Sequence, residues 1–178
     1  MKQKNTLKCI IVLISICLVI AVAMAAVNLI TADRIAQGER KKQEEAMSVV
    51  LSENGGFDEI SLAEKPESVT GVYRDRDGEG YVVLLSAKGY DASKPMSIAV
   101  GLTNEGKITK CQVISCSGET SGIGTKVQNE SFLKTFEGKD ASLSGVDSIG
   151  GATISSGGMI TAVKDAFEAL KQAQEVAS

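Results

Sequence analysis

Nineteen consecutive residues near the start of the chain, CIIVLISICLVIAVAMAAV from Cys9 to Val27, carry no charge. At a rise of about 1.5 Å per residue, a helix of this length crosses most of the ~30 Å hydrocarbon core of a membrane. The run is longer than the ~7–15 apolar residues of a typical secretory signal. We therefore predict an uncleaved transmembrane anchor, with a signal peptide cleaved near Ala23-Met24-Ala25 as the alternative.

The charges that flank the apolar run predict its orientation. Lys2, Lys4 and Lys8 precede it, whereas the residues that follow it mix both signs. Because cytoplasmic flanks carry an excess of Lys and Arg, we expect a cytoplasmic N-terminus, one pass through the cytoplasmic (inner) membrane, and the remainder on the periplasmic or extracellular side. All 22 acidic residues and all but three of the 19 basic ones follow residue 30. The chain after residue 30 therefore has a net charge of about −6, and we do not expect it to bind nucleic acid.

The residue inventory excludes several kinds of catalytic and metal site. The chain has no His, which removes the commonest general base and the commonest metal ligand. None of its four Cys forms a CxxC pair, so zinc and iron–sulfur sites are not expected. In a strand, the odd spacing of Cys111 and Cys116 places them on opposite faces, and we expect free thiols. We therefore predict neither a catalytic residue nor a metal site in this chain.

Hydrophobic periodicity predicts an α+β fold for the exported part. A charged helix is expected over 31–51, stopped at Asn54–Gly56, followed by a polar connector over 57–68. Alternation with a period of two predicts strands at 69–73, 81–87, 96–103 and 108–115. A short helix is expected at 129–136. Apolar residues at helical spacing from Met159 to Leu170 predict a C-terminal amphipathic helix, and the order of elements favours a mostly antiparallel sheet.

Two loops rich in glycine and hydroxyl residues are candidates for a functional site. The first, SGETSGIG, covers 117–124; the second, DSIGGATISSGG, covers 147–158 and leads into the C-terminal helix. Glycines let backbone N–H groups approach a ligand, and a helix N-terminus offers unpaired N–H groups and a positive dipole end, which suits a phosphate. The commoner explanation is that Ser155 or Ser156 caps the helix. Glu119 could position a ligand, although a loop carboxylate is usually exposed to solvent.

Taken together, the two loops resemble the motifs of FMN-binding domains. DSIGGAT (147–153) resembles the flavinylation motif D-x-x-[ST]-G-A-T, with Gly150 where Ser or Thr is common. ETSGIG (119–124) resembles the companion motif E-T-P-G-[LI]-G, with Ser121 in place of Pro. Gly89-Tyr90 and the segment 95–109 follow the strand–hairpin pattern of the same family. Behind a single N-terminal span, these motifs resemble the RnfG family of Rnf electron-transport complexes, which is related to the NqrC family of Na⁺-translocating NADH:quinone oxidoreductases.

The resemblance implies a covalent flavin cofactor. In the family, the last Thr of the flavinylation motif is esterified to the phosphate of FMN, so Thr153 is the implied acceptor. A separate flavin transferase makes this bond, with FAD as the donor and Mg²⁺ as a requirement. The other cofactor-binding residues that the resemblance implies are Glu119, Thr120, Gly122, Gly124, Gly151, Ala152, Ser155 and Ser156.

The resemblance also implies a function. The chain would be an electron-transfer subunit of an ion-translocating ferredoxin:NAD⁺ oxidoreductase, with the other Rnf subunits as partners, Na⁺ or H⁺ as coupling ion, and no independent catalysis. Residues 1–30 would be the anchor, 31–66 a juxtamembrane helix and connector, and 67–178 the FMN-binding domain. The alternatives are the NqrC component of the Na⁺-translocating NADH:quinone oxidoreductase, a stand-alone membrane-anchored extracellular flavoprotein for electron transfer or reductase chemistry, and a non-redox domain that binds a small anion or a partner.

Overall fold

The computed structural model describes residues 2–51, 55–78 and 80–176. Contacts divide the chain into two compact units, Met1–Lys41 and Lys42–Ser178. The second unit includes residues 42–66, which the sequence assigned to a separate juxtamembrane helix and connector.

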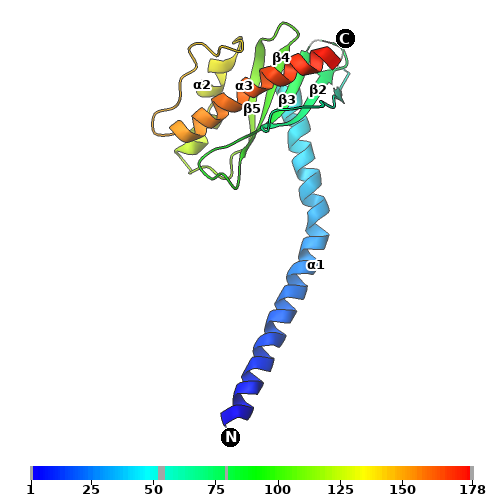
Figure 1. Cartoon of the computed structure of the whole chain (residues 1–178), viewed down its shortest axis with the longest axis vertical. Helices are drawn as coiled ribbons and strands as arrows, with labels where there is room; N and C mark the ends of the chain where they lie inside the picture. The colour runs from blue at the N-terminus through cyan, green and yellow to red at the C-terminus, as the bar shows by residue number, and fades with distance from the viewer. Residues whose placement is uncertain (1, 52–54, 79, 177–178) are drawn as a thin grey trace. The chain divides into compact units, whose positions relative to one another are not determined.

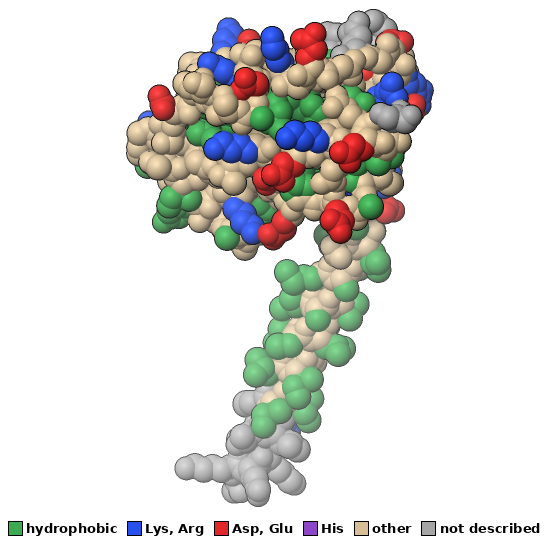
Figure 2. All heavy atoms as spheres, turned by 45° about the horizontal axis from the view of Figure 1, so that its top comes forward, with side chains coloured by type: hydrophobic (Ala, Val, Ile, Leu, Met, Phe, Trp, Pro, Cys, Tyr) green, Lys and Arg blue, Asp and Glu red, His purple; other side chains and the backbone are tan. Residues whose placement is uncertain are grey.

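The first unit consists of helix α1, which spans Lys2–Val50 and continues into the second unit. Its large apolar side chains from Ile10 to Ile30 are exposed, as Figure 2 shows along the surface of this helix. It is the one helix among the described residues that is long and apolar enough to cross a membrane. The helix ends at Val50; the predicted stop at Asn54–Gly56 lies partly outside the described residues, because Asn54 is not among them.

In the second unit, the described residues form one antiparallel sheet whose strands follow their order in the sequence. The predicted α+β fold is therefore confirmed. Strands β4 (Met96–Thr103) and β5 (Ile108–Ser115) have the predicted bounds, and β2 (Val69–Asp75) and β3 (Gly80–Ala87) are slightly longer than predicted. The expectation of a plain connector over 57–68 was wrong at its start, because Phe57–Glu59 pairs with β2 as strand β1.

Both faces of the sheet are covered, which explains why the central strand β3 is apolar on both sides. Helix α3 (Thr153–Val176), drawn from orange to red in Figure 1, lies across one face and packs its apolar side on the main core. The last turns of α1 cover the other face, where Met47 and Val50 belong to one buried cluster with Val82 and Leu84. The Thr109 hydroxyl fixes this end of α1, because its Oγ1 donates to the Val50 carbonyl oxygen at 2.5 Å.

Short helical turns close one end of the main core. The 3₁₀ helix η1 (Gly124–Gln128) is followed by α2 (Glu130–Leu133) and a second 3₁₀ turn, η2 (Lys134–Phe136), where the sequence predicted one helix over 129–136. Phe132 and Phe136 pack edge to face, with ring centroids 5.2 Å apart and planes at 87°. Edge-to-face contact is a favourable arrangement for two buried aromatic rings.

The thiols of Cys111 and Cys116 are free and contact the same core. Cys116 lies beyond the end of β5, so the alternation that predicted opposite faces does not apply to it. Burial raises the pKa of the Cys111 thiol far above its usual range. Burial, and to a smaller extent the charge of Glu119, raise the pKa of the Cys116 thiol.

Candidate functional site

The two glycine-rich loops meet at a cleft of about 510 Å³, within the ~300–1,000 Å³ typical of small-molecule pockets. Three segments that are far apart in the sequence line the cleft: the loop after β3, the 117–124 loop, and the start of α3. Its lining residues are Tyr90, Thr120, Ile123, Gly124, Gly151, Ala152, Thr153, Ile154 and Ser155. Six of the nine predicted cofactor-binding residues are among them.

Helix α3 starts inside the second loop, at Thr153, so that the sequence ISSGG forms its first turns rather than a loop before it. Gly151 makes the turn into the helix with φ at +78°, a conformation that favours glycine. The first N–H groups of an α-helix have no acceptor within the helix, which leaves those of Thr153, Ile154 and Ser155 at the cleft. Thr153 is therefore an exposed hydroxyl at a helix N-terminus.

The two serines expected to face a phosphate are instead buried and hydrogen-bonded inside the protein. Ser156 Oγ donates to the Ala152 carbonyl oxygen at 2.8 Å and accepts from the Ile149 N–H at 2.9 Å. Ser155 Oγ donates to Glu119 Oε2. Both hydroxyls thus hold the 147–158 segment and the start of α3 in place, because each already has a partner in the protein. Ala152, not a serine, occupies the position before the first helical residue.

Glu119 is buried, unlike most loop carboxylates, and joins the three segments of the cleft. Its Oε2 accepts from the Ser155 hydroxyl at the start of α3, and its Oε1 accepts from the Tyr90 N–H at 3.1 Å. A negative group near a helix N-terminus is favoured by the helix dipole. A Cβ at Gly124 would lie 2.6 Å from Glu119 Oε2 and 2.9 Å from Ser155 Oγ, and a Cβ at Gly89 would overlap Oε1. These glycines make room for Glu119 rather than for a ligand.

The rest of the 117–124 loop is a series of tight turns. The Thr120 carbonyl accepts from the N–H groups of Ile123 and Thr125, at 3.1 and 3.3 Å, which leaves the exposed Thr120 side chain at the cleft. Gly122 has φ at +74° and donates its N–H to Thr125 Oγ1 at 2.9 Å. Three of the predicted cofactor-binding residues are not among those that line the cleft: Gly122, Ser156 and Glu119.

Three large apolar side chains at the cleft are exposed: Tyr90 at 69%, Ile154 at 61% and Ile123 at 49%. They were missed as site residues in the sequence. The signal that could have found them was their context, because Ile123 and Ile154 interrupt loops made of small polar residues, and Tyr90 belongs to the Gly89-Tyr90 pair of the family pattern. An exposed apolar rim around unpaired N–H groups suits a ligand with a flat apolar part and an anionic part.

No cationic side chain is among the described residues that line the cleft. The described residues also contain no group of three or more acidic or thiol side chains arranged to hold a metal ion. Among these lining residues, an anion would therefore depend on backbone N–H groups, side-chain hydroxyls and the helix dipole rather than on a cation.

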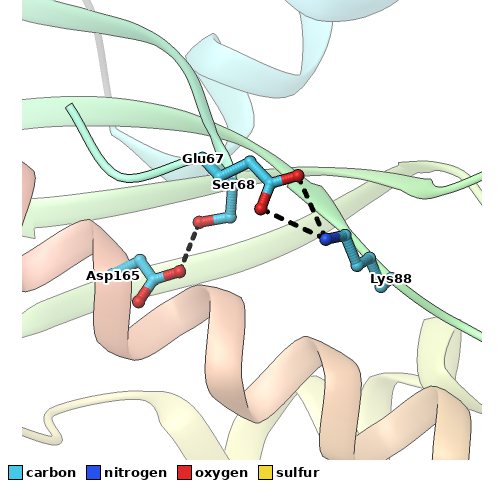
Figure 3. A network of polar contacts seen from close by, with 4 residues as sticks. All are labelled: Glu67, Ser68, Lys88 and Asp165. Carbon is cyan, nitrogen blue, oxygen red and sulfur yellow. Dashed lines mark hydrogen bonds and ion pairs between the residues drawn. The ribbon is translucent and has the colours of Figure 1, made fainter.

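A second hollow of about 540 Å³ lies beside α3, and Figure 3 shows the polar contacts at its wall. Lys88 Nζ contacts both carboxylate oxygens of Glu67, at 3.1 and 3.2 Å, and Ser68 Oγ donates to Asp165 Oδ2 at 2.6 Å. Glu67 and Lys88 thus pair with each other, Asp165 accepts from Ser68, and the lining includes no residue of the 119–124 or 147–153 motifs. We therefore assign the candidate site to the cleft at Thr153.

Comparisons with known proteins concern the domain that contains this cleft. Residues 89–168 match the family model described as the FMN-binding domain. The G subunit of the proton-translocating ferredoxin:NAD⁺ oxidoreductase complex from Clostridium ljungdahlii is 26% identical over 162 residues, which cover 85% of this chain and 84% of the relative. A crystal structure of NqrC from Shewanella oneidensis aligns with a TM-score of 0.47 at 20% identity, covering 68% of this chain and 74% of that one. The matches to the domain and to the Clostridium protein confirm the resemblance that the motifs predicted.

Proposed function

We propose that the chain is the FMN-carrying subunit of a membrane-bound, ion-translocating ferredoxin:NAD⁺ oxidoreductase of the Rnf type, and that Thr153 holds FMN through a phosphoester. The observation that carries the proposal is the exposed Thr153 hydroxyl, at the N-terminus of α3 and in one cleft with both motif loops. The Clostridium relative, which is part of such a complex, supports the same function.

The residues of the cleft fit FMN. Backbone N–H groups at the start of α3 would hold the phosphate, and the apolar rim of Tyr90, Ile123 and Ile154 would contact the flavin ring. When bound, FMN supplies the redox chemistry, whereas the protein supplies position and electrostatics. The chain's own groups hold the acceptor hydroxyl in place, because Ser155 and Ser156 fix the first turn of α3.

The composition of the cleft also gives a reason for a covalent bond. With no Lys or Arg among its described lining residues, and with the Glu119 carboxylate behind it, the cleft would bind a free phosphate monoester weakly. A covalent bond removes the need for tight reversible binding. This matters on the outer side of the membrane, where a released cofactor is lost by dilution.

We assign residues 1–30 to the membrane anchor, with the N-terminus in the cytoplasm and the flavin domain on the outer side. For the remainder we keep the division predicted from the sequence, with 31–66 as the connecting segment, from which strand β1 joins the sheet, and 67–178 as the flavin domain. A chain with one candidate span among its described residues carries electrons rather than ions, so ion transport falls to the partner proteins of the complex.

Flavin fluorescence of the SDS-denatured protein, after co-expression with a flavin transferase, tests the attachment. The native chain and Thr153→Ser should give a fluorescent band, and Thr153→Ala a dark one. Thr161→Ala is the matched control, because Thr161 is also exposed on α3, two turns later. A dark native band beside a labelled control flavoprotein would exclude the covalent flavin.

Membership of the complex is tested separately. The tagged full-length chain, purified from its own membranes in mild detergent, should carry partner subunits and support ferredoxin-dependent reduction of NAD⁺. Isolation of a fluorescent chain without partners would instead favour the stand-alone flavoprotein.

A further inference from the structure

Tyr90 is exposed although every other aromatic ring of the chain is buried or partly buried. The chain has four Phe and three Tyr and no Trp, and all seven rings lie within the described residues. Six of them pack in or against the two core clusters: Phe57, Tyr73, Tyr81, Phe132, Phe136 and Phe167. Tyr90 is 69% exposed, so the packing of the core does not account for it.

The ring of Tyr90 stands between two hollows. It lines the cleft that contains Thr153, and it also lines an adjoining hollow of about 460 Å³ with Asp91, Gly118, Glu119 and Thr120. A ligand tethered at Thr153 therefore has an aromatic face within the same cleft.

The backbone beneath Tyr90 is held firmly from two sides. Its N–H donates to the buried Glu119 carboxylate at 3.1 Å, and the preceding Gly89 lies against the same carboxylate. One residue earlier, the Lys88 carbonyl touches α3 where Gly158 leaves room for it. An exposed aromatic side chain on a fixed backbone is a preorganised binding surface, because little order is lost when a ligand covers it.

We propose that Tyr90 is the aromatic residue on which the planar, conjugated ring of the cofactor stacks, with Ile123 and Ile154 completing the apolar contact. This inference rests on the proposed function, because it takes the ligand to be a flavin held at Thr153. Stacked or edge-on contact between aromatic rings is favourable beyond the area that it buries. The contact would also withdraw three exposed apolar side chains from water.

Flavin fluorescence in the folded and denatured protein tests this contact, because a tyrosine ring stacked on a flavin quenches its emission. The full-length, covalently loaded chain is compared with Tyr90→Leu and Tyr90→Phe. Tyr73→Phe is the control, since Tyr73 packs with the second core cluster on the other face of the sheet. In-gel fluorescence of each variant measures covalent loading, and calorimetry of the unloaded protein measures folding.

We expect the native chain to be strongly quenched when folded and to gain emission on denaturation. Tyr90→Leu should lose most of this quenching, Tyr90→Phe part of it, and Tyr73→Phe none, when the emission of each variant is divided by its measured covalent loading. A loaded and folded Tyr90→Leu protein that remains as quenched as the native chain would overturn the assignment of Tyr90 alone. A native band without covalent flavin would overturn the proposed function, and this inference with it.

Discussion

Replacement of Glu119 tests whether the cleft is built by the protein before any cofactor arrives. Its carboxylate accepts from the Ser155 hydroxyl and the Tyr90 N–H, and it is the group that joins the start of α3 to the loop after β3. In Glu119→Ala both donors lose their acceptor. A buried donor left unsatisfied costs about 1–3 kcal/mol.

Because Ser155 is buried and the Tyr90 N–H only partly so, we expect the free energy of unfolding to fall by about 2–4 kcal/mol in Glu119→Ala. For a chain of this size, that corresponds to a decrease of about 4–16 °C in unfolding temperature, at about 2–4 °C per kcal/mol. Glu119→Gln keeps the shape: its oxygen can accept from Tyr90 N–H while its amide donates to Ser155 Oγ. We expect a loss of about 1 kcal/mol there.

Differential scanning calorimetry of the full-length, unloaded protein in detergent micelles measures these changes. Glu105→Ala is the matched control, because Glu105 lies exposed in the turn between β4 and β5. Its unfolding temperature should match that of the native chain. If Glu119→Ala unfolds within a degree or so of Glu105→Ala, the carboxylate does not hold the cleft together and the reasoning is refuted.

Two further predictions concern the framework around the site. Gly158→Ala should destabilise the protein by about 1–3 kcal/mol, because a Cβ there would overlap the Lys88 carbonyl oxygen. Gly157→Ala should stabilise it by about 0.5–1 kcal/mol, because a Cβ there meets no other atom and Ala favours the helix. Calorimetry measures both changes. On the surface, the hydrogen bond from Arg76, at 2.8 Å, holds the pKa of Asp58 below its usual value. The stabilisation from this ion pair is therefore fully present at pH values above the usual pKa of Asp, and it is lost as the pH falls through the lowered pKa. Arg76→Ala should raise the pKa of Asp58 back towards its usual range in an NMR titration of the carboxyl carbon.

The bounds of a strand could be predicted from the sequence where the local pattern of apolar residues and turns specifies them. The β4–β5 hairpin has the predicted bounds because alternation of apolar residues and a short turn specify it locally. Strand β1 could not be predicted in this way. Phe57–Glu59 has only three residues, of which Phe57 alone is partly buried, and it forms by pairing with the edge of β2. Such pairing depends on tertiary contacts that a local pattern does not contain.

The candidate site, like the fold, could be predicted from the sequence only in part. Both motif loops were named as candidates from the sequence, and in the structure residues of both, Thr153 among them, line one cleft. The motifs did not reveal that the side chains of Ser155, Ser156 and Glu119 are buried and form hydrogen bonds within the protein. A serine that binds a ligand and a serine that fixes a turn have the same sequence signature, since both follow a glycine-rich loop at a helix start. Only the partner of each hydroxyl separates the two roles.

The geometry also explains which departures from the family motifs this chain tolerates. A Cβ added at Gly150 would meet no atom within 4 Å, and its φ is not positive, so the Ser or Thr common there and the Gly found here both fit. Ser121, in place of Pro, is exposed on the first loop. Gly151 cannot vary in the same way, because its φ of +78° strains any side chain, and Glu119 cannot because two donors depend on it. The two changed positions are therefore exposed, whereas Gly151 and Glu119 are fixed by backbone conformation and by hydrogen bonds.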